Sequence, residues 1–392
     1  MYLRKIYPEL EAHLEKKYIT VLTGMRRVGK TTALKHVLHK AKTTNKIYLD
    51  LERIENRHLF NKSNYKDIEL SLAAEGIDLE KPCVIALDEI QLVPNITSVI
   101  KYLYDSYKIK FLVTGSSSFY IKNHFTESLA GRKTIFEMHP LDFGEFLQFK
   151  EVKISSKIPA LHEFNLAFYN KHRSHYEEYI QFGGFPEVVM EPDKKSKKEY
   201  LRDIINAYIE LDIKLLSDFQ ATDDLYRLMK LIAARVGSKT DYSKISSLTG
   251  LHRQKVKDYF QLLEHTYFIN MIPPFTKNAD REISLQKKFY FSDTGILNEL
   301  AEVNSGAVFE NAIANQLLRI GKLNYYNTKS GQEIDFIVDE KTAVEVKESA
   351  SKTDLDILNR RAESLKMKKR LLIGRKFSIE KFSGFSWGGS MF

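Results

Sequence analysis

The stretch that decides the fold of the N-terminal part of the chain, residues 21–32, reads Val21-Leu22-Thr23-Gly24-Met25-Arg26-Arg27-Val28-Gly29-Lys30-Thr31-Thr32 and runs into a helical pattern. It joins an apolar strand to a Gly-x-x-x-x-Gly-Lys-Thr loop. Gly24 and Gly29 let successive backbone N–H groups curl around an anion, at which the following helix points its positive end. The pattern predicts a phosphate-binding loop, with Lys30 on the β- and γ-phosphates and the Thr31 hydroxyl on Mg²⁺.

The composition of the chain is that of a globular protein. Its 392 residues exceed the size of one ordinary core, and 43% hydrophobic with 28% charged residues argues against wholesale disorder. The formal charge of +9 is compatible with a polyanionic partner such as nucleic acid, although many basic proteins bind none. The single cysteine, Cys83, excludes an intrachain disulfide and a multi-cysteine metal site. No apolar run approaches the length of a membrane span, so we expect a cytoplasmic protein without a membrane partner.

Alternating strands and helices follow the loop. Residues 47–51 and 83–89 are apolar runs typical of a parallel sheet covered on both faces, and residues 65–74 form a helical stretch between them. Asp88 and Glu89 end the second run. We expect Asp88 to hold the Mg²⁺ shell and Glu89 to orient and deprotonate the attacking water.

A further strand, residues 110–118, ends in small hydroxyl side chains. Ser116 is the candidate polar sensor of the γ-phosphate or its water, Ser117 is the alternative, and a turn that caps the next helix explains the same residues. Arg132 is a candidate charge-stabilising arginine, acting in cis or from a neighbouring subunit, and a surface arginine is the alternative. The nucleotide-binding residues predicted together are Gly24, Arg27, Val28, Gly29, Lys30, Thr31, Thr32, Asp88 and Ser116.

Five stretches resemble a family of prokaryotic AAA-type ATPases that carry a C-terminal domain of uncharacterised function. They are the loop at 24–32, Leu87-Asp88-Glu89-Ile90-Gln91, residues 114–117, residues 129–132, and residues 139–147. The resemblance extends over essentially the whole chain. It implies an AAA-like sheet with the residues above in the roles given, bound ATP and Mg²⁺, and no particular substrate.

The middle of the chain, from Pro159 to about Gln261, has helical periodicity, interrupted by a tight turn at residues 182–187. Residues 242–260 are typical of a helix, a glycine turn and a second helix, and residues 262–272 supply apolar segments for a wing. The polar cluster at the start of the second helix suits a recognition helix in a DNA groove. A protein-contact module or a lid is the alternative. The cluster comprises His252, Arg253, Gln254, Lys255 and Lys257.

A second α/β pattern follows a linker-like stretch at residues 273–280. Strands are predicted at 333–338 and 342–347, so Glu345 and Lys347 point to one face and Asp335 on the adjacent strand can converge with them. Two carboxylates can hold Mg²⁺ while a lysine stabilises charge or positions water, which suffices for phosphodiester hydrolysis. Glu310 is a candidate third carboxylate. Asp293-Thr294-Gly295 is interpreted as a helix-starting turn.

The set Glu310, Asp335 and Glu345-Val346-Lys347 resembles the PD-(D/E)-x-K nuclease superfamily, with Ile334 in place of the proline of the family name. The resemblance implies a restriction-nuclease-like core. An exposed hairpin with ordinary charges, or a nuclease fold without activity, is the alternative.

These observations predict an α/β protein of three segments: an AAA-like P-loop ATPase core at 1–150, a helical and winged-helix-like segment at 151–272, and a nuclease-like segment at 273–392. The expected function is ATP hydrolysis whose nucleotide state controls DNA contact and Mg²⁺-dependent DNA cleavage. The alternative is an ATP-dependent regulatory switch or scaffold with an inactive nuclease-like domain. DNA is the expected partner, with a homo-oligomer or a protein partner as further options.

Overall fold

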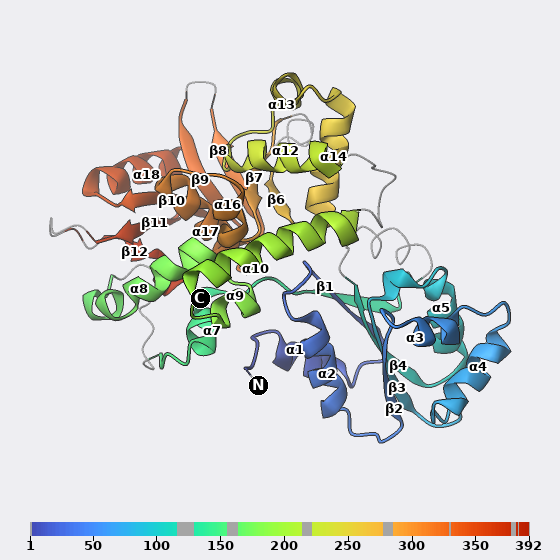
Figure 1. Cartoon of the computed structure of the whole chain (residues 1–392). Coiled ribbons are helices and arrows are strands. Elements are labelled where there is room, and N and C mark those ends of the chain that lie inside the picture. Colours follow the sequence, from blue (N-terminus) through green and yellow to red (C-terminus); the bar gives the residue numbers. More distant parts are fainter. Residues whose placement is uncertain are drawn as a thin grey trace. The chain divides into compact units, whose positions relative to one another are not determined.

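The computed structural model describes residues 2–115, 129–154, 164–213, 222–276, 285–328, 331–377, 382 and 384–391. The chain divides into two compact units. Unit 1 comprises Met1–His139, Glu210–Asp218 and His265–Tyr267, and unit 2 comprises Pro140–Ile209, Phe219–Glu264 and Phe268–Phe392. Each unit contains one five-stranded sheet. Figure 1 shows the helices and strands of both.

Unit 1 is built on a parallel sheet with the strand order β2-β3-β4-β1-β5. Helices cover both of its faces, with α1 and α2 on one face and α3, α4 and α5 on the other (Figure 1). The strands are β1 (Ile19–Thr23), β2 (Lys46–Asp50), β3 (Cys83–Asp88), β4 (Ile109–Gly115) and β5 (Lys133–Glu137). The helices are α1 (Tyr7–His13), α2 (Lys30–Lys40), α3 (Ile54–Phe60), α4 (Tyr65–Ala74), the 3₁₀ turn η1 (Ile90–Leu92) and α5 (Ile96–Ser106).

The sequence explains why these strands lie at the centre of unit 1. Every residue of β1 and of β3 is buried, as continuous apolar runs require when helices cover both faces of a sheet. Cys83 is buried at the start of β3, and burial raises the pKa of its thiol to about 11. The predicted α/β class with a parallel sheet and the predicted helix at 65–74 are confirmed.

In its described residues, unit 2 begins with four helices, and a π-helical turn follows whose residues are divided between the two units. They are α7 (Phe143–Phe149), α8 (Leu166–Phe182), α9 (Pro186–Met190), α10 (Lys194–Ala207) and η2 (Tyr208–Ile213). Asp293, the N-cap of α16 (Thr294–Leu300), accepts hydrogen bonds from Gly295 N at 2.8 Å and Ile296 N at 3.1 Å, which agrees with the predicted helix-starting turn. The same carboxylate accepts a bond from Gly184 N at 2.7 Å, so it also fixes the tight turn between α8 and α9.

Three helices and a strand pair form the next part of unit 2. They are α12 (Thr222–Ala233), α13 (Tyr242–Thr249), α14 (Arg253–His265), and the antiparallel strands β6 (Ile269–Ile272) and β7 (Lys288–Phe291). Gly250 ends α13 with a φ of 71°, the left-handed conformation that glycine adopts without strain. The helix, glycine turn and second helix therefore lie where the pattern predicts them.

The second sheet has the order β12-β11-β10-β9-β8, antiparallel from β8 to β10 and parallel from β10 to β12. Two helices, α17 (Ser305–Leu318) and α18 (Lys352–Ser364), pack against it. The strands are β8 (Leu323–Asn327), β9 (Glu333–Val338), β10 (Thr342–Ser349), β11 (Lys369–Lys376) and β12 (Ser386–Trp387), followed by the 3₁₀ turn η3 (Gly388–Ser390).

The described part of the predicted linker, residues 273–276, differs from the prediction. Phe275 N donates to Tyr325 O at 2.6 Å, and Tyr325 N donates to Pro273 O at 3.1 Å. This segment therefore lies along β8 as an added strand-like edge, because prolines are tolerated where a sheet edge needs few donors. The division into three segments stays a prediction. Among the described helices, none is both long and apolar enough to cross a membrane.

Candidate functional site

The predicted phosphate-binding loop connects β1 to α2. Gly29 is the N-cap of α2 with a φ of 98°, and Gly24 has a φ of 144°. A Cβ atom on Gly24 would lie 2.1 Å from the carbonyl oxygen of Met138, so only glycine fits there. Arg27, exposed within the loop, also has a positive φ, of 63°. The loop thus has the curled backbone that an anion site requires.

Lys30 is held inside this loop. Its ammonium donates to Gly24 O at 3.0 Å and to Met25 O at 2.8 Å, and the residue is 4% exposed. Val28 is buried, Thr31 is half-buried and Thr32 is exposed at the first turn of α2. The loop therefore places a buried cation and a helix N-terminus at the same point, which is the combination that binds phosphate.

The two predicted acidic residues lie at the end of β3. The Asp88 carboxylate accepts a hydrogen bond from the Thr114 hydroxyl through Oδ1 and one from the Tyr48 hydroxyl through Oδ2, the latter at 2.8 Å. Burial and the neighbouring Asp88 raise the pKa of Tyr48, which therefore stays a donor at neutral pH. Glu89 has a φ of 54° and donates its backbone N–H to Thr114 Oγ1 at 3.1 Å.

The sheet brings the loop and the acidic pair to one edge. β4 lies between β1 and β3 and pairs in parallel with both, so Thr114 is in register with Leu22 and one residue beyond the partner of Leu87. Because parallel strands end at the same edge of a sheet, Asp88, Glu89 and the loop that follows β1 meet there. Buried lysine, helix N-terminus and carboxylates at one edge fit ATP with Mg²⁺, for which Thr31 and Asp88 would be the ligands.

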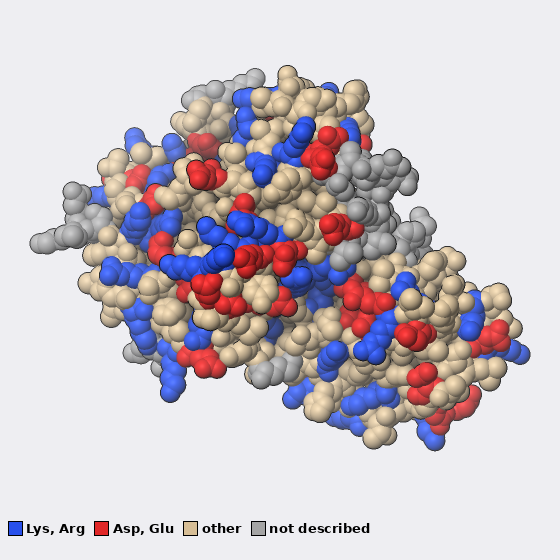
Figure 2. Space-filling view, viewed as in Figure 1, with Lys and Arg blue, Asp and Glu red and all other residues tan. Residues whose placement is uncertain are grey.

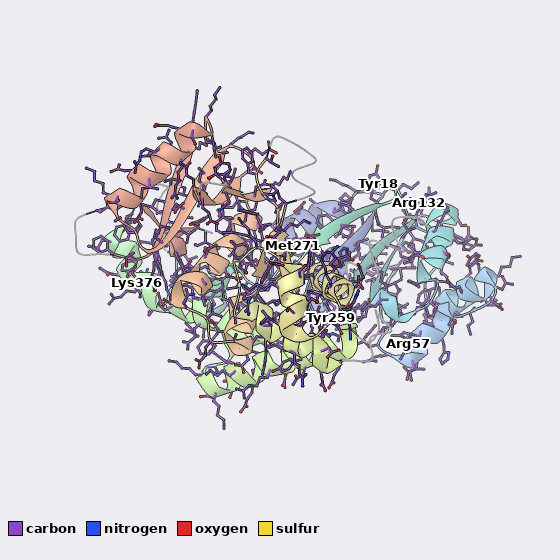
Figure 3. All side chains as sticks on the ribbon, turned by 90° about the horizontal axis from the view of Figure 1, so that it is seen from above. Tyr18, Arg57, Arg132, Tyr259, Met271 and Lys376 are labelled. Carbon is purple, nitrogen blue, oxygen red and sulfur yellow. The ribbon has the colours of Figure 1, made fainter. Side chains whose placement is uncertain are left out.

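Arg132 lies at the opposite edge of the same sheet. Its carbonyl accepts from Ile19 N at 2.8 Å at the start of β1, and Figure 3 shows it beside Tyr18. Its guanidinium pairs with Asp105 at 2.9 Å. This position rules out the predicted role in cis, because the loop follows the other end of β1, and leaves a role in a second chain as a prediction. Ser116 and its alternative Ser117 lie outside the described residues.

The predicted C-terminal residues come together around β9 and β10. Asp335 Oδ2 accepts a hydrogen bond from Val346 N at 2.8 Å, and the Lys347 ammonium lies 2.7 Å from Glu345 Oε1. Glu310, on α17, accepts a hydrogen bond from the Tyr290 hydroxyl at 2.6 Å. Glu345 is 5% exposed, and its second oxygen, Oε2, has no hydrogen-bond partner.

Electrostatics link these three carboxylates. Burial, followed by the neighbouring Asp335, raises the pKa of Glu345 to about 7 against the effect of Lys347. Burial and Asp335 also raise the pKa of Glu310, and burial raises that of Asp335. Burial lowers the pKa of Lys347, but Asp335 and Glu345 outweigh it and the pKa lies above its usual value. Buried acids whose pKa values are raised in this way would be stabilised in their charged form by a cation.

The carboxylates do not form a ready-made cage. In the described part of the chain, no group of three or more His, Cys, Asp or Glu side chains converges closely enough to hold a metal ion. Glu345 Oε2 is nevertheless a buried acceptor without a donor, which costs free energy unless a cation or a ligand satisfies it. Asp335 and Glu345 therefore fit as ligands of a divalent cation, and Glu310, whose pKa Asp335 raises, stays a further candidate.

Three basic or phenolic groups at this site were not predicted. Lys288 on β7 lies 2.7 Å from Glu333 Oε1 and 3.8 Å from Glu310 Oε1, and Tyr290 lies two residues further along the same strand. Arg361 on α18 lies 3.7 Å from Glu345 Oε1. No sequence motif contains these residues. The alternation of Lys288 and Tyr290 with two phenylalanines is the one sequence feature that indicates a polar face on this strand.

The predicted DNA-contacting residues occupy the start of α14. His252, Arg253 and Gln254 are exposed, whereas Lys255 pairs with Asp224 of α12 at 2.7 Å. Lys257 lies over the Tyr242 ring at 5.8 Å. Elsewhere Figure 2 shows acidic side chains interspersed with the basic ones rather than a wide basic face. Fewer basic side chains of α14 are therefore available to contact phosphate than the sequence indicates.

Comparison with known protein families divides the chain into three matches. Residues 16–147 match the family described as an AAA domain. Residues 173–307 and 305–385 match two domains of unknown function, DUF8612 and DUF4143. The first match, together with the loop and sheet described above, supports an AAA-type P-loop ATPase domain with nucleotide-dependent activity. The two other matches carry no function, so the winged-helix and nuclease assignments stay predictions.

The individual relatives also give no information on function. An uncharacterised protein of Methanocaldococcus jannaschii is 26% identical over 339 residues, which cover 84% of this chain and 74% of the relative. An uncharacterised protein of Haemophilus influenzae is 25% identical over 86% of this chain and 85% of the relative. The solved structure of the Aeropyrum pernix ORC1 protein in complex with DNA is 12% identical over 76% of this chain and 92% of that one, with a TM-score of 0.34. Similarity of that size supports no conclusion about this chain.

Proposed function

We propose that the protein binds and hydrolyses ATP and that its nucleotide state controls contact with DNA. The observation that carries the first half is the position of the Lys30 ammonium, held by two carbonyls inside a loop whose Gly24 has no room for a Cβ atom. A buried lysine at a helix N-terminus, with two carboxylates at the same sheet edge, has the charge distribution that a nucleoside triphosphate with Mg²⁺ complements.

The geometry of unit 1 supports the following roles for its residues. The backbone N–H groups of residues 24–30 bind the phosphates, and Lys30 neutralises their charge. Glu89, at the end of β3, accepts the proton of the attacking water. Asp88 and Thr31 would hold Mg²⁺, which supplies charge neutralisation of the phosphates when bound. Thr114 and Tyr48 orient the Asp88 carboxylate by hydrogen bonds to its two oxygens.

Contact with DNA is assigned to α13 and α14. His252, Arg253 and Gln254 are exposed at the start of α14, where the second helix of such a pair enters a major groove. Arg253 and Gln254 have the donors and acceptors that read base edges. We expect phosphate contacts to come from lysines near this helix, and binding that weakens as the salt concentration rises.

Mg²⁺-dependent cleavage of DNA is assigned to Asp335, Glu345 and Lys347. The unpartnered Glu345 Oε2 supports a cation there, and the Lys347 ammonium 2.7 Å from Glu345 stands ready to stabilise negative charge on a phosphate. The rival proposal keeps the ATPase and makes the C-terminal domain a silent binding module. It is favoured by the absence, within the described residues, of a converged three-carboxylate group.

The experiment that distinguishes these proposals measures cleavage of labelled single-stranded, duplex and branched DNA in the presence of Mg²⁺, with and without ATP. Wild type is compared with Asp335→Ala and Lys30→Ala. Cleavage that is lost in Asp335→Ala assigns the chemistry to the C-terminal site, and its loss in Lys30→Ala shows that ATP controls it.

DNA binding is measured in parallel by fluorescence anisotropy at several salt concentrations. Binding without cleavage, sensitive to ATP and to salt, favours the switch. If wild type binds no DNA in any nucleotide state, the proposal that the nucleotide state controls DNA contact is contradicted.

A further inference from the structure

We propose that the C-terminal carboxylate site takes one divalent cation, and that the ammonium group of Lys288 supplies the positive charge that a second cation would otherwise provide. This inference rests on the proposed cation-dependent site and specifies its metal content. The number of cations bound per chain tests this inference, and that number can be measured whether or not the protein cleaves DNA.

The first observation is the position of Lys288. Its Nζ lies 2.7 Å from Glu333 Oε1 and 3.8 Å from Glu310 Oε1, so it bridges an acid on β9 and an acid on α17. Only 8% of its side chain is exposed. A lysine so deeply buried stays charged only if acids surround it, and here two do. The ammonium thus lies between two of the acids of the cluster.

The second observation is the way in which Tyr290 fixes Glu310. The phenol donates to Glu310 Oε1 at 2.6 Å, the same oxygen that faces Lys288. Lys288 and Tyr290 are two residues apart on β7 and so lie on one face of that strand. Glu310 is therefore already committed to two groups of the chain, which leaves it poorly placed to ligate a metal ion as well.

The third observation is the charge of the cluster. Four carboxylates, Glu310, Glu333, Asp335 and Glu345, face three cationic side chains, Lys288, Lys347 and Arg361. When all are ionised, one negative charge remains. Among the described carboxylate oxygens of this cluster, Glu345 Oε2 is the one that is buried and has no hydrogen-bond partner. One divalent cation changes the net charge from one negative to one positive, whereas a second would leave three positive charges in the buried site, so the balance accommodates one cation.

The origin of Lys288 adds a structural consequence. β7 pairs with β6, which follows α14, and neither strand belongs to residues 305–385 that match the C-terminal family. The strand pair after the predicted recognition helix therefore supplies a charge to the cluster. Lys288 is a positioning residue in this account, because it acts on Glu310 and Glu333 rather than on a substrate.

The test counts bound Mn²⁺ by electron paramagnetic resonance in nucleotide-free protein. The parent is the full chain with Lys30→Ala and Asp88→Asn, which removes the binding site in unit 1. We expect the parent to bind one Mn²⁺ per chain and to lose it when Asp335→Asn is added. Zero or two ions in the parent overturn the proposal, and this reading needs no change at Lys288.

Variants at Lys288 then test its role directly. Lys288→Met in the parent should bind a second Mn²⁺ per chain, or bind the first at least tenfold more tightly, because Glu310 and Glu333 lose their resident cation. Lys288→Arg should behave as the parent, since the charge is kept. Lys287→Met is the matched control, a lysine removed from the neighbouring position, and should also behave as the parent. An unchanged number of ions at unchanged affinity in a folded Lys288→Met overturns the proposal.

Discussion

Substitution of Thr114 by valine removes one hydroxyl group and keeps the shape of the side chain. Thr114 is fully buried on β4, donates to Asp88 Oδ1 and accepts from Glu89 N at 3.1 Å. The hydroxyl is thus the one group of the described chain seen to bond both acidic residues of the site. In the variant, the Asp88 carboxylate keeps only its bond from Tyr48, and the Glu89 N–H is left without its acceptor.

The size of the effect follows from those two bonds. A hydrogen bond to a charged group contributes about 1.5–3 kcal/mol, and a buried donor left unsatisfied costs about 1–3 kcal/mol. Part of this loss appears as lower stability, for which we expect roughly 2 kcal/mol by urea unfolding. The part that falls on the placement of Asp88 and Glu89 should slow ATP hydrolysis by roughly tenfold to a hundredfold, at 1.36 kcal/mol for each factor of ten.

The assay measures steady-state hydrolysis and the affinity for a fluorescent ATP analogue on the same preparations. We expect Thr114→Val to lower kcat and to leave affinity within about threefold, because the phosphate loop itself is unchanged. Thr114→Ser keeps the hydroxyl and should hydrolyse ATP nearly as wild type does. A folded Thr114→Val with kcat within twofold of wild type would refute the reasoning, as would a loss confined to ATP affinity.

Three further predictions concern single residues. Gly24→Ala should destabilise unit 1 by more than about 3 kcal/mol by urea unfolding, since its Cβ would lie 2.1 Å from Met138 O, whereas Gly76→Ala meets no atom within 4 Å and should cost about 1 kcal/mol. Burial raises the pKa of Asp293 from 3.8 to about 6, so wild type should lose roughly 2 kcal/mol of stability relative to Asp293→Asn as the pH rises from 4 to 7, and an equal pH profile for both would contradict this. Arg132→Ala should lower stability by less than about 1 kcal/mol and leave hydrolysis by dilute protein within threefold, and a fall of a hundredfold would show that this arginine reaches the loop of a second chain.

The parts of the fold that the sequence predicts are those set by local chemistry. The loop at 24–31 needs glycines at positive φ and a lysine at the start of a helix, and both requirements are visible in the residues themselves. The strands β1 and β3 were predicted because a strand that is buried on both faces is apolar almost throughout. The helix at 65–74 was predicted from periodicity and has the predicted bounds.

What could not be predicted depends on register and on distant pairs. Thr114 contacts Asp88 because β4 lies between β1 and β3. The residues of β4, 109–115, do not indicate this strand order. Asp293 was correctly interpreted as starting a helix, but its bond to Gly184 joins residues 109 positions apart. Lys288 looks like one more surface lysine until β7 is seen to face α17 and β9.

The linker interpretation failed, and one buried lysine was not predicted. Lys197 lies among the exposed lysines Lys194, Lys195 and Lys198, yet it is 1% exposed and pairs with Glu178 at 3.3 Å. The prolines at 273 and 274 suggested a linker, yet the segment extends the edge of a sheet. The composition of a segment indicates only how exposed its residues are on average. Whether one side chain or one strand edge is buried depends on the partner that it meets in the fold.

The measurement that tests the central claim most directly is ATP hydrolysis by wild type, Lys30→Ala and Lys40→Ala with Mg²⁺ present. Lys40 ends the same helix and is exposed, so its loss controls for the removal of a lysine from α2. The account predicts hydrolysis that Lys30→Ala lowers by at least a hundredfold and that Lys40→Ala leaves unchanged. Equal hydrolysis by wild type and Lys30→Ala, or none by wild type that binds ATP and Mg²⁺, would contradict it.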